Sequence, residues 1–137
     1  MILLGYLVFG QVSLAAAQNM QPRQTAMAYL HFWQAGEYSA MYDMLSEQSK
    51  NYVSKTDFIS WHQEFRDKYI IERFEITGVE NQSQTASVEY RLQLTAIGGT
   101  SKARDCRIRL IKEAGSWSVE YQLPETAQGH RPRPHVA

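Results

Sequence analysis

The feature that most constrains the fold is a strict alternation of apolar and polar residues between positions 86 and 95. Side chains two residues apart lie on the same face of a strand, so this segment predicts a strand with one buried and one solvated face. Such a strand is typical of an antiparallel sheet that other elements cover on one side. The apolar positions are Ala86, Val88, Tyr90, Leu92 and Leu94, and the polar positions are Ser87, Glu89, Arg91, Gln93 and Thr95.

Three further segments show the same period of two, and turns separate them. Residues 78–83, Gly98-Gly99 and residues 113–116 carry the turn residues that punctuate strands. Pro124 ends the pattern, because proline has no N–H to donate to a ladder. We therefore expect about four antiparallel strands. The inward positions predicted on the other three strands are Ile70, Phe74 and Ile76, then Cys106, Ile108 and Leu110, then Trp117, Val119 and Tyr121.

The helices that could cover this sheet come before it in the chain. Residues 22–35 and 37–45 are predicted as two helices, and residues 46–53 as a turn or a loose helical segment. A third helix begins after Ser54, which stands three residues ahead of Asp57 as in a capping box. This order predicts an α+β fold, with about three N-terminal helices packed on the sheet. The apolar stripe of the third helix is Phe58, Trp61, Phe65 and Tyr69.

Length and composition exclude several classes of protein. A chain of 137 residues allows one domain, and a single cysteine rules out an internal disulfide. The 14 basic and 14 acidic side chains cancel, whereas nucleic-acid binders usually carry a basic surplus, so we expect no nucleic-acid partner. The four histidines show no ligand spacing on one element, so we expect no metal, and we expect no cofactor.

The first seventeen residues predict export. Residues 1–17 are uncharged, largely apolar and end in Ala15-Ala16-Ala17, which is typical of a signal peptide cleaved before Gln18, although no Lys or Arg precedes the apolar core. The alternatives are a transmembrane anchor or a buried helix, but the run is shorter than the about 20 residues of a span. We therefore expect an exported, periplasmic or secreted protein with no stable span after cleavage. Residues 18–122 would form the domain and 123–137 a disordered tail.

One long segment and two short ones carry a family resemblance. They are Ala26-x-x-Tyr29-Leu30-x-x-Trp33-x-x-Gly36-x-Tyr38-x-x-Met41-Tyr42-x-Met44-Leu45-Ser46, Phe58 in the third helix, and Gly115-Ser116-Trp117-Ser118-Val119. Over residues 22–122 the sequence resembles the nuclear transport factor 2 (NTF2)-like superfamily, above all the NTF2-like N-terminal domain of some penicillin-binding transpeptidases.

The resemblance implies a strongly curved sheet that wraps round helices to form a cone with a pocket. In the transpeptidases such a domain precedes a catalytic domain, but no Ser-x-x-Lys nucleophile occurs in this sequence. We expect a stand-alone exported module. Members of this superfamily serve as binding domains, spacers or small enzymes, so the fold alone does not choose between these roles.

Aromatic residues on both layers are the candidates for lining the pocket. His62 lies at the edge of the third helix's apolar stripe, where it could reach the pocket mouth or stay half-buried at a boundary. Glu72 could point into the cone as a base, or a bulge could turn it outward. The predicted ligand-binding residues are Tyr29, Trp33, Trp61, His62, Phe65, Tyr69, Glu72, Tyr90, Trp117 and Tyr121.

These patterns favour a non-catalytic binding module of the cell envelope. The partner would be a small apolar ligand in the cone, or an envelope protein or second copy on the outer sheet face. A small isomerase, lyase or hydrolase using the same pocket is the alternative. A basic strip, interpreted as the ordinary outer face of a strand, is formed by Lys102, Arg104, Arg107, Arg109 and Lys112.

Overall fold

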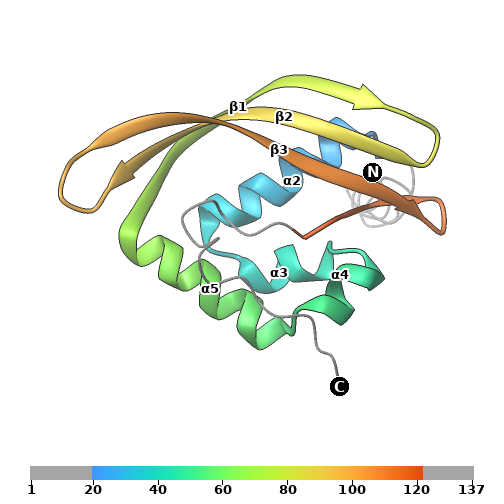
Figure 1. Cartoon of the computed structure of the whole chain (residues 1–137), viewed down its shortest axis with the longest axis horizontal. Helices are drawn as coiled ribbons and strands as arrows, with labels where there is room; N and C mark the ends of the chain where they lie inside the picture. Colours follow the sequence, from blue (N-terminus) through green and yellow to red (C-terminus); the bar gives the residue numbers. More distant parts are fainter. Residues whose placement is uncertain (1–19, 122–137) are drawn as a thin grey trace, which may run out of the picture.

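The computed structural model describes residues 20–121 and shows four helices followed by four strands in that range. The helices pack beneath an arched sheet (Figure 1). The predicted signal peptide and the predicted tail lie outside the described residues. The elements are α2 (Pro22–Ala35), α3 (Tyr38–Asp43), α4 (Glu47–Tyr52), α5 (Lys55–Lys68), β1 (Tyr69–Asn81), β2 (Thr85–Ala96), β3 (Ser101–Glu113) and β4 (Ser116–Val119).

The sheet is a meander in which each strand pairs antiparallel with the next, in the order β1-β2-β3-β4. The alternation on β2 is confirmed, because all five apolar side chains from Ala86 to Leu94 are at most 8% exposed. On β3, Ile108 and Leu110 are buried and Arg107 and Arg109 are exposed, as predicted. The α+β fold with a curved antiparallel sheet is thus confirmed.

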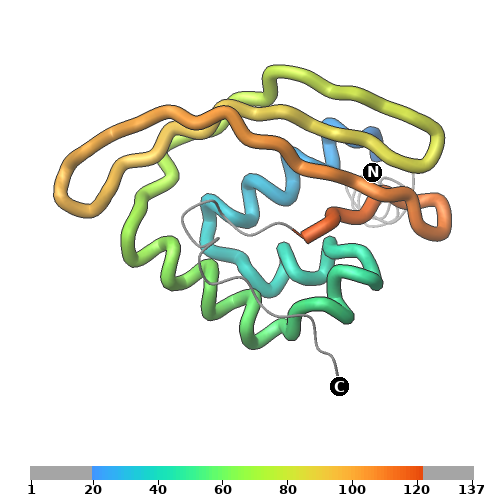
Figure 2. Tube along the Cα trace, viewed as in Figure 1, coloured from blue at the N-terminus to red at the C-terminus, as the bar shows by residue number. Residues whose placement is uncertain are grey.

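The helices cover the inner face of this sheet. The tube in Figure 2 shows α2 crossing beneath the strands and α5 passing into β1 without a loop. One hydrophobic core joins the two layers, with Leu30 and Phe58 contributed by the helices and Val88 and Leu110 by the strands. Each of these four side chains is at most 1% exposed.

Residues 46–53, expected to form a turn or a loose segment, contain the short helix α4, so the described helices number four instead of three. Ser46 caps this helix by accepting a hydrogen bond from the Ser49 N–H at 3.1 Å. The Ser49 hydroxyl in turn accepts one from the Tyr121 N–H at 2.9 Å. These bonds tie α4 to the residues that follow β4. The predicted cap of the next helix is confirmed, because Ser54 Oγ accepts a bond from the Asp57 N–H.

The prediction for the start of β1 is wrong at two residues. A register shift between Ile71 and Arg73 interrupts the pairing with β2, and such a bulge exchanges the two faces of a strand. Ile70 is therefore 52% exposed instead of sharing the face of Phe74 and Ile76. Tyr69, assigned to the helical stripe, is the first residue of β1.

Candidate functional site

Aromatic side chains from every layer meet between the helices and the inner face of the sheet. Phe58 is fully buried at their centre. Its ring centroid lies 4.3 Å from that of His62 and 5.5 Å from those of Tyr42 and Tyr121. Tyr121 therefore links the end of the sheet to the helices. We call the surface where these side chains gather the inner face. The predicted residues on it are Tyr29, Trp33, Trp61, His62, Phe65, Tyr69, Tyr90 and Tyr121.

His62 is buried more deeply than at either position predicted for it, the pocket mouth or a half-buried boundary. Its side chain is 3% exposed, and its Nδ1 lies 2.9 Å from the carbonyl oxygen of Phe58, one helical turn earlier. The rings of Trp33 and Tyr38 contact it from α2 and α3. Burial lowers the pKa of His62 to about 4, against the weaker opposing effect of the Phe58 carbonyl. The imidazole is therefore neutral at pH 7.

Three phenols of the inner face have a raised pKa. Burial raises the pKa of Tyr29, Tyr90 and Tyr121. Tyr90 also hydrogen-bonds Cys106. The charged form of Tyr29 would raise the pKa of both other tyrosines, so the three hydroxyls lie within electrostatic range of one another. The hydroxyl of Tyr121 is buried and makes no hydrogen bond in the part of the chain that the structure describes.

Glu72 lies away from this cluster. The bulge at the start of β1 turns it outward, where its Oε1 accepts a 2.6 Å hydrogen bond from the Thr95 hydroxyl. Both side chains lie on the outer side of the sheet, where Glu72 is exposed and Thr95 is half-buried, because the neighbouring Leu94 points inward. Of the two positions predicted for Glu72, the outward one is thus observed. Its carboxylate does not reach the inner face.

The outer face carries charge pairs that run across the strands. Arg91 Nε lies 3.1 Å from Asp105 Oδ1, and Arg107 Nη2 lies 3.2 Å from Glu89 Oε2. Of the basic strip, Arg107 and Arg109 lie on this face as expected. Assigning the other three residues to it was wrong, because strand alternation places Lys102, Arg104 and Lys112 on the side of Cys106 and Ile108.

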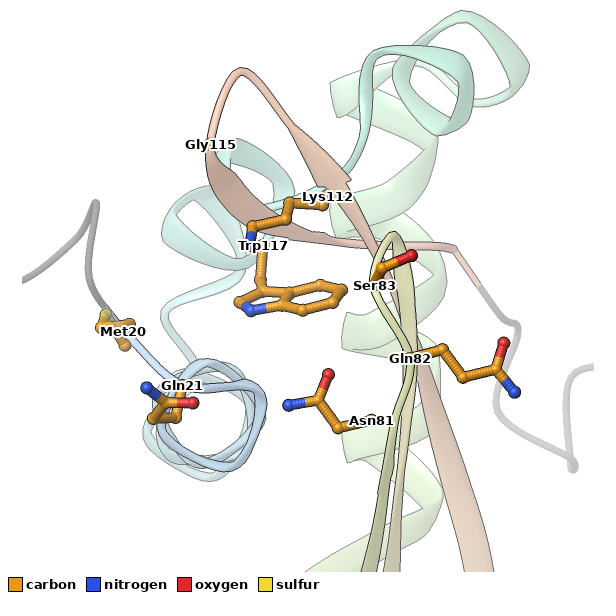
Figure 3. A pocket seen from close by; sticks show the side chains of 8 residues that line it. All are labelled: Met20, Gln21, Asn81, Gln82, Ser83, Lys112, Gly115 and Trp117. Carbon is orange, nitrogen blue, oxygen red and sulfur yellow. The ribbon is translucent and has the colours of Figure 1, made fainter.

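Trp117 packs against the edge of the same core and also lines a cavity of about 340 Å³ at the rim of the sheet. We call it the rim cavity. It lies where the start of α2, the β1–β2 turn and the β3–β4 hairpin meet. Figure 3 shows the Trp117 indole between the side chains of Lys112, Ser83, Asn81 and Gln21. The Lys112 ammonium lies 5.4 Å from the centroid of the Trp117 ring.

Sequence reasoning found Trp117 but missed the polar residues beside it. Gln21, Asn81 and Lys112 lie on three separate segments, and no spacing in the sequence connects them. Asn81 occurs in a stretch interpreted only as a turn. Among residues 20–121 there is no group of three potential metal ligands, and no helix in that range is long and apolar enough to cross a membrane.

The fold and the aromatic inner face define a class of protein, the α+β domains in which a curved antiparallel sheet closes over N-terminal helices. The family model described as the NTF2-like N-terminal transpeptidase domain matches residues 21–125, and the chain belongs to this family. The resemblance proposed from the sequence is thereby confirmed. No curated protein matches the chain significantly.

Solved structures share the fold at low sequence identity. A SEC-C motif containing protein from Rhodopseudomonas palustris has a TM-score of 0.63 at 10% identity, over 77% of this chain and 80% of that one. A protein from Campylobacter jejuni assigned as an NTF2-like transpeptidase has a TM-score of 0.52 at 13% identity, over 74% and 99%. An NTF2-like protein with a cystatin-like fold from Novosphingobium aromaticivorans has a TM-score of 0.53 at 12% identity, over 89% of this chain and 91% of that one.

Proposed function

We propose that the chain is a non-catalytic binding module of the cell envelope, whose inner face takes a small, mainly apolar ligand with one hydrogen-bond acceptor. The observation that carries this proposal is the buried Tyr121 hydroxyl, which has no hydrogen-bond partner among the described residues. A buried donor left unpaired costs about 1–3 kcal/mol, and an acceptor on a ligand would recover that free energy. The neighbouring rings of Phe58 and Trp61 supply apolar surface.

The chemistry of the inner face supports binding over catalysis. A general acid or base works best when its pKa lies near the operating pH. The pKa of His62 is lowered well below neutrality, and the pKa values of the inner phenols are raised. Glu72 is on the other side of the sheet. An isomerase, lyase or hydrolase would need another proton carrier on this face.

Two further observations bear on the setting and on the surface used. Residues 1–17 have the composition of an export signal. Membership of a transpeptidase domain family is consistent with a function outside the cytoplasm. On the outer face, Arg91 and Arg107 are paired within the sheet. An envelope protein or a second copy docking there would compete with those pairs, so the proposal places the ligand on the inner face.

Native mass spectrometry of the exported protein, purified without denaturation, tests the proposal. We expect the wild-type chain to carry a bound small molecule. Tyr121→Phe should lower its affinity about fivefold, the effect of losing one neutral hydrogen bond. Tyr42→Phe is the matched control, because the Tyr42 hydroxyl already donates to the Val53 carbonyl at 2.8 Å.

Two outcomes would contradict the proposal. One is a wild-type mass equal to the polypeptide alone. The other is chemical conversion of a small molecule when the protein is incubated with an envelope extract, because conversion would indicate an enzyme.

A further inference from the structure

One edge of the sheet is only partly covered by its last strand. β3 is 13 residues long, but β4 pairs only with Leu110–Glu113 at its end. The chain leaves the ladder soon after β4, because the Tyr121 N–H donates to Ser49 Oγ instead of to β3. In the part of the chain that the structure describes, no strand lies beside residues 101–107 on this side. We call residues 101–107 the open edge, and in Figure 1 they run along the border of the arch.

The backbone groups of the open edge alternate in direction. At the two ends of the β2–β3 ladder, the Thr100 carbonyl accepts from Ala96 and the Lys112 N–H donates to Gln84, and the register between them is unbroken. The even-numbered residues of β3 therefore bond to the β2 side, and the odd-numbered residues face away from it. The residues whose N–H and C=O groups are directed at an incoming strand are Ser101, Ala103, Asp105 and Arg107.

The charge beside the open edge differs between its two sides. On the outer side, both charged residues of the edge already form ion pairs with side chains of β2. On the inner side are Lys102 and Arg104, whose cross-strand partners on β2 are leucines. Lys102 is exposed, and its Nζ lies 5.7 Å from the centroid of the Tyr69 ring. A further strand would therefore be stabilised by acidic side chains on its inner side, since opposite charges on neighbouring strands attract.

We propose that the open edge binds an extended peptide segment with acidic residues at alternate positions, which adds to the sheet as an antiparallel strand. Main-chain hydrogen bonds to the odd-numbered residues supply affinity, and Lys102 and Arg104 select the acidic side chains. A second copy of this chain fits less well, because it would bring its own two cations to the same side of the junction. This inference goes beyond the proposed function, because it concerns a strand edge and a peptide.

Fluorescence anisotropy with a labelled peptide of alternating threonine and glutamate, as long as the open edge, tests this inference. We expect saturable binding. A peptide with lysine in place of glutamate should bind at least about fivefold more weakly, because one exposed charge pair contributes up to about that factor and here attraction becomes repulsion. A peptide of the same composition with its glutamates in one block should also bind more weakly, because its acidic side chains then point to both sides.

Two N-methylated peptides test the hydrogen bonds without altering the protein. When the glutamates of an antiparallel strand lie opposite Lys102 and Arg104, the threonine N–H groups face β3 and the glutamate N–H groups point away from it. Methylation of the threonine nitrogens should therefore weaken binding at least about tenfold, because it removes several hydrogen bonds. Methylation of the glutamate nitrogens should leave binding unchanged.

Variants of the edge itself complete the test. Ala103→Pro removes one outward N–H without removing a bond to β2, and proline is tolerated on edge strands. It should weaken binding about fivefold or more, the effect of losing one hydrogen bond, whereas Ala103→Val keeps the N–H and should bind normally. Circular dichroism would establish that both variants fold.

Lys102→Gln should weaken binding up to about fivefold. Lys112→Gln is the matched control, because Lys112 lies on the same side of β3 with its Nζ 5.4 Å from the centroid of the Trp117 ring, but where β4 already covers the edge. The inference is overturned if the alternating peptide does not bind saturably, if the two N-methylated peptides bind equally, or if Lys112→Gln weakens binding as much as Lys102→Gln.

Discussion

At the scale of single residues, His62 shows how packing decides the role of a titratable group. The imidazole has the size of a core side chain, and α5 places it one turn after Phe58, whose carbonyl accepts its Nδ1–H. Its ring sits among aromatic rings instead of facing solvent. Sequence periodicity located His62 at the edge of the apolar stripe, but it could not show that residues of α2 and α3 close over that edge.

His62 should make the domain less stable in acid. The unfolded chain binds a proton at its ordinary pKa of about 6.5, whereas the folded chain binds it only near pH 4. The folded state is therefore fully stabilised by its neutral His62 above about pH 6.5, and this stabilisation is lost as the pH falls toward 4. We expect a loss of roughly 3 kcal/mol between pH 7 and pH 4, since one pKa unit corresponds to about 1.4 kcal/mol.

Urea unfolding at a series of pH values measures this loss. His62→Gln should remove that part of the pH dependence, while His31→Gln should retain it, because His31 is exposed. Equal pH dependence in the wild-type and His62→Gln chains would contradict the assignment of the effect to His62.

At the scale of elements, the junction of α2 and α3 depends on a glycine. Gly36 ends α2 with φ +78°, a left-handed conformation that favours glycine. The guanidinium group of Arg66, on α5, occupies the position that a Cβ at residue 36 would take. A side chain at this position would therefore strain the backbone and displace a contact between two helices.

Replacing this glycine should separate the two effects. Gly36→Ala should lower the free energy of unfolding by about 1–3 kcal/mol, the usual cost of a strained backbone position. Gly115→Ala is the control, because Gly115 has φ +82° but open space where its Cβ would lie. Urea unfolding should show the larger loss for Gly36→Ala, and equal losses would mean that Arg66 moves aside at no cost.

The elements also show which parts of the fold can be predicted from sequence. The alternation on β2 and the cap at Ser54 are local signals, and the structure follows them. The bulge at Glu72 depends on pairing with β2, so Ile70 was placed on the wrong face. The short α4 lacks an apolar stripe, although Ser46, its N-cap, was a signal that could have located it.

At the scale of the whole molecule, the aromatic inner face and the rim cavity lie at different places in the fold. The arched sheet and the helices enclose the inner face, while the rim cavity lies at one end, where three distant segments meet. The inner aromatics could be predicted because they follow the core pattern. The rim cavity could not, because its polar residues come together only when the sheet curves over the start of α2.

The central claim is that ligand binding takes place on the inner face, and calorimetric titration with dodecanoate tests it most directly. Dodecanoate offers an alkyl chain and an acceptor for Tyr121. Cys106→Trp places a bulky ring on the inner face, whereas Arg107→Trp places the same ring on the outer face one residue later. Circular dichroism would establish that both variants fold. We predict that Cys106→Trp weakens binding at least about tenfold, or about 1.4 kcal/mol, and that Arg107→Trp leaves it unchanged. No binding by the wild-type chain, or equal weakening by both variants, would contradict the account.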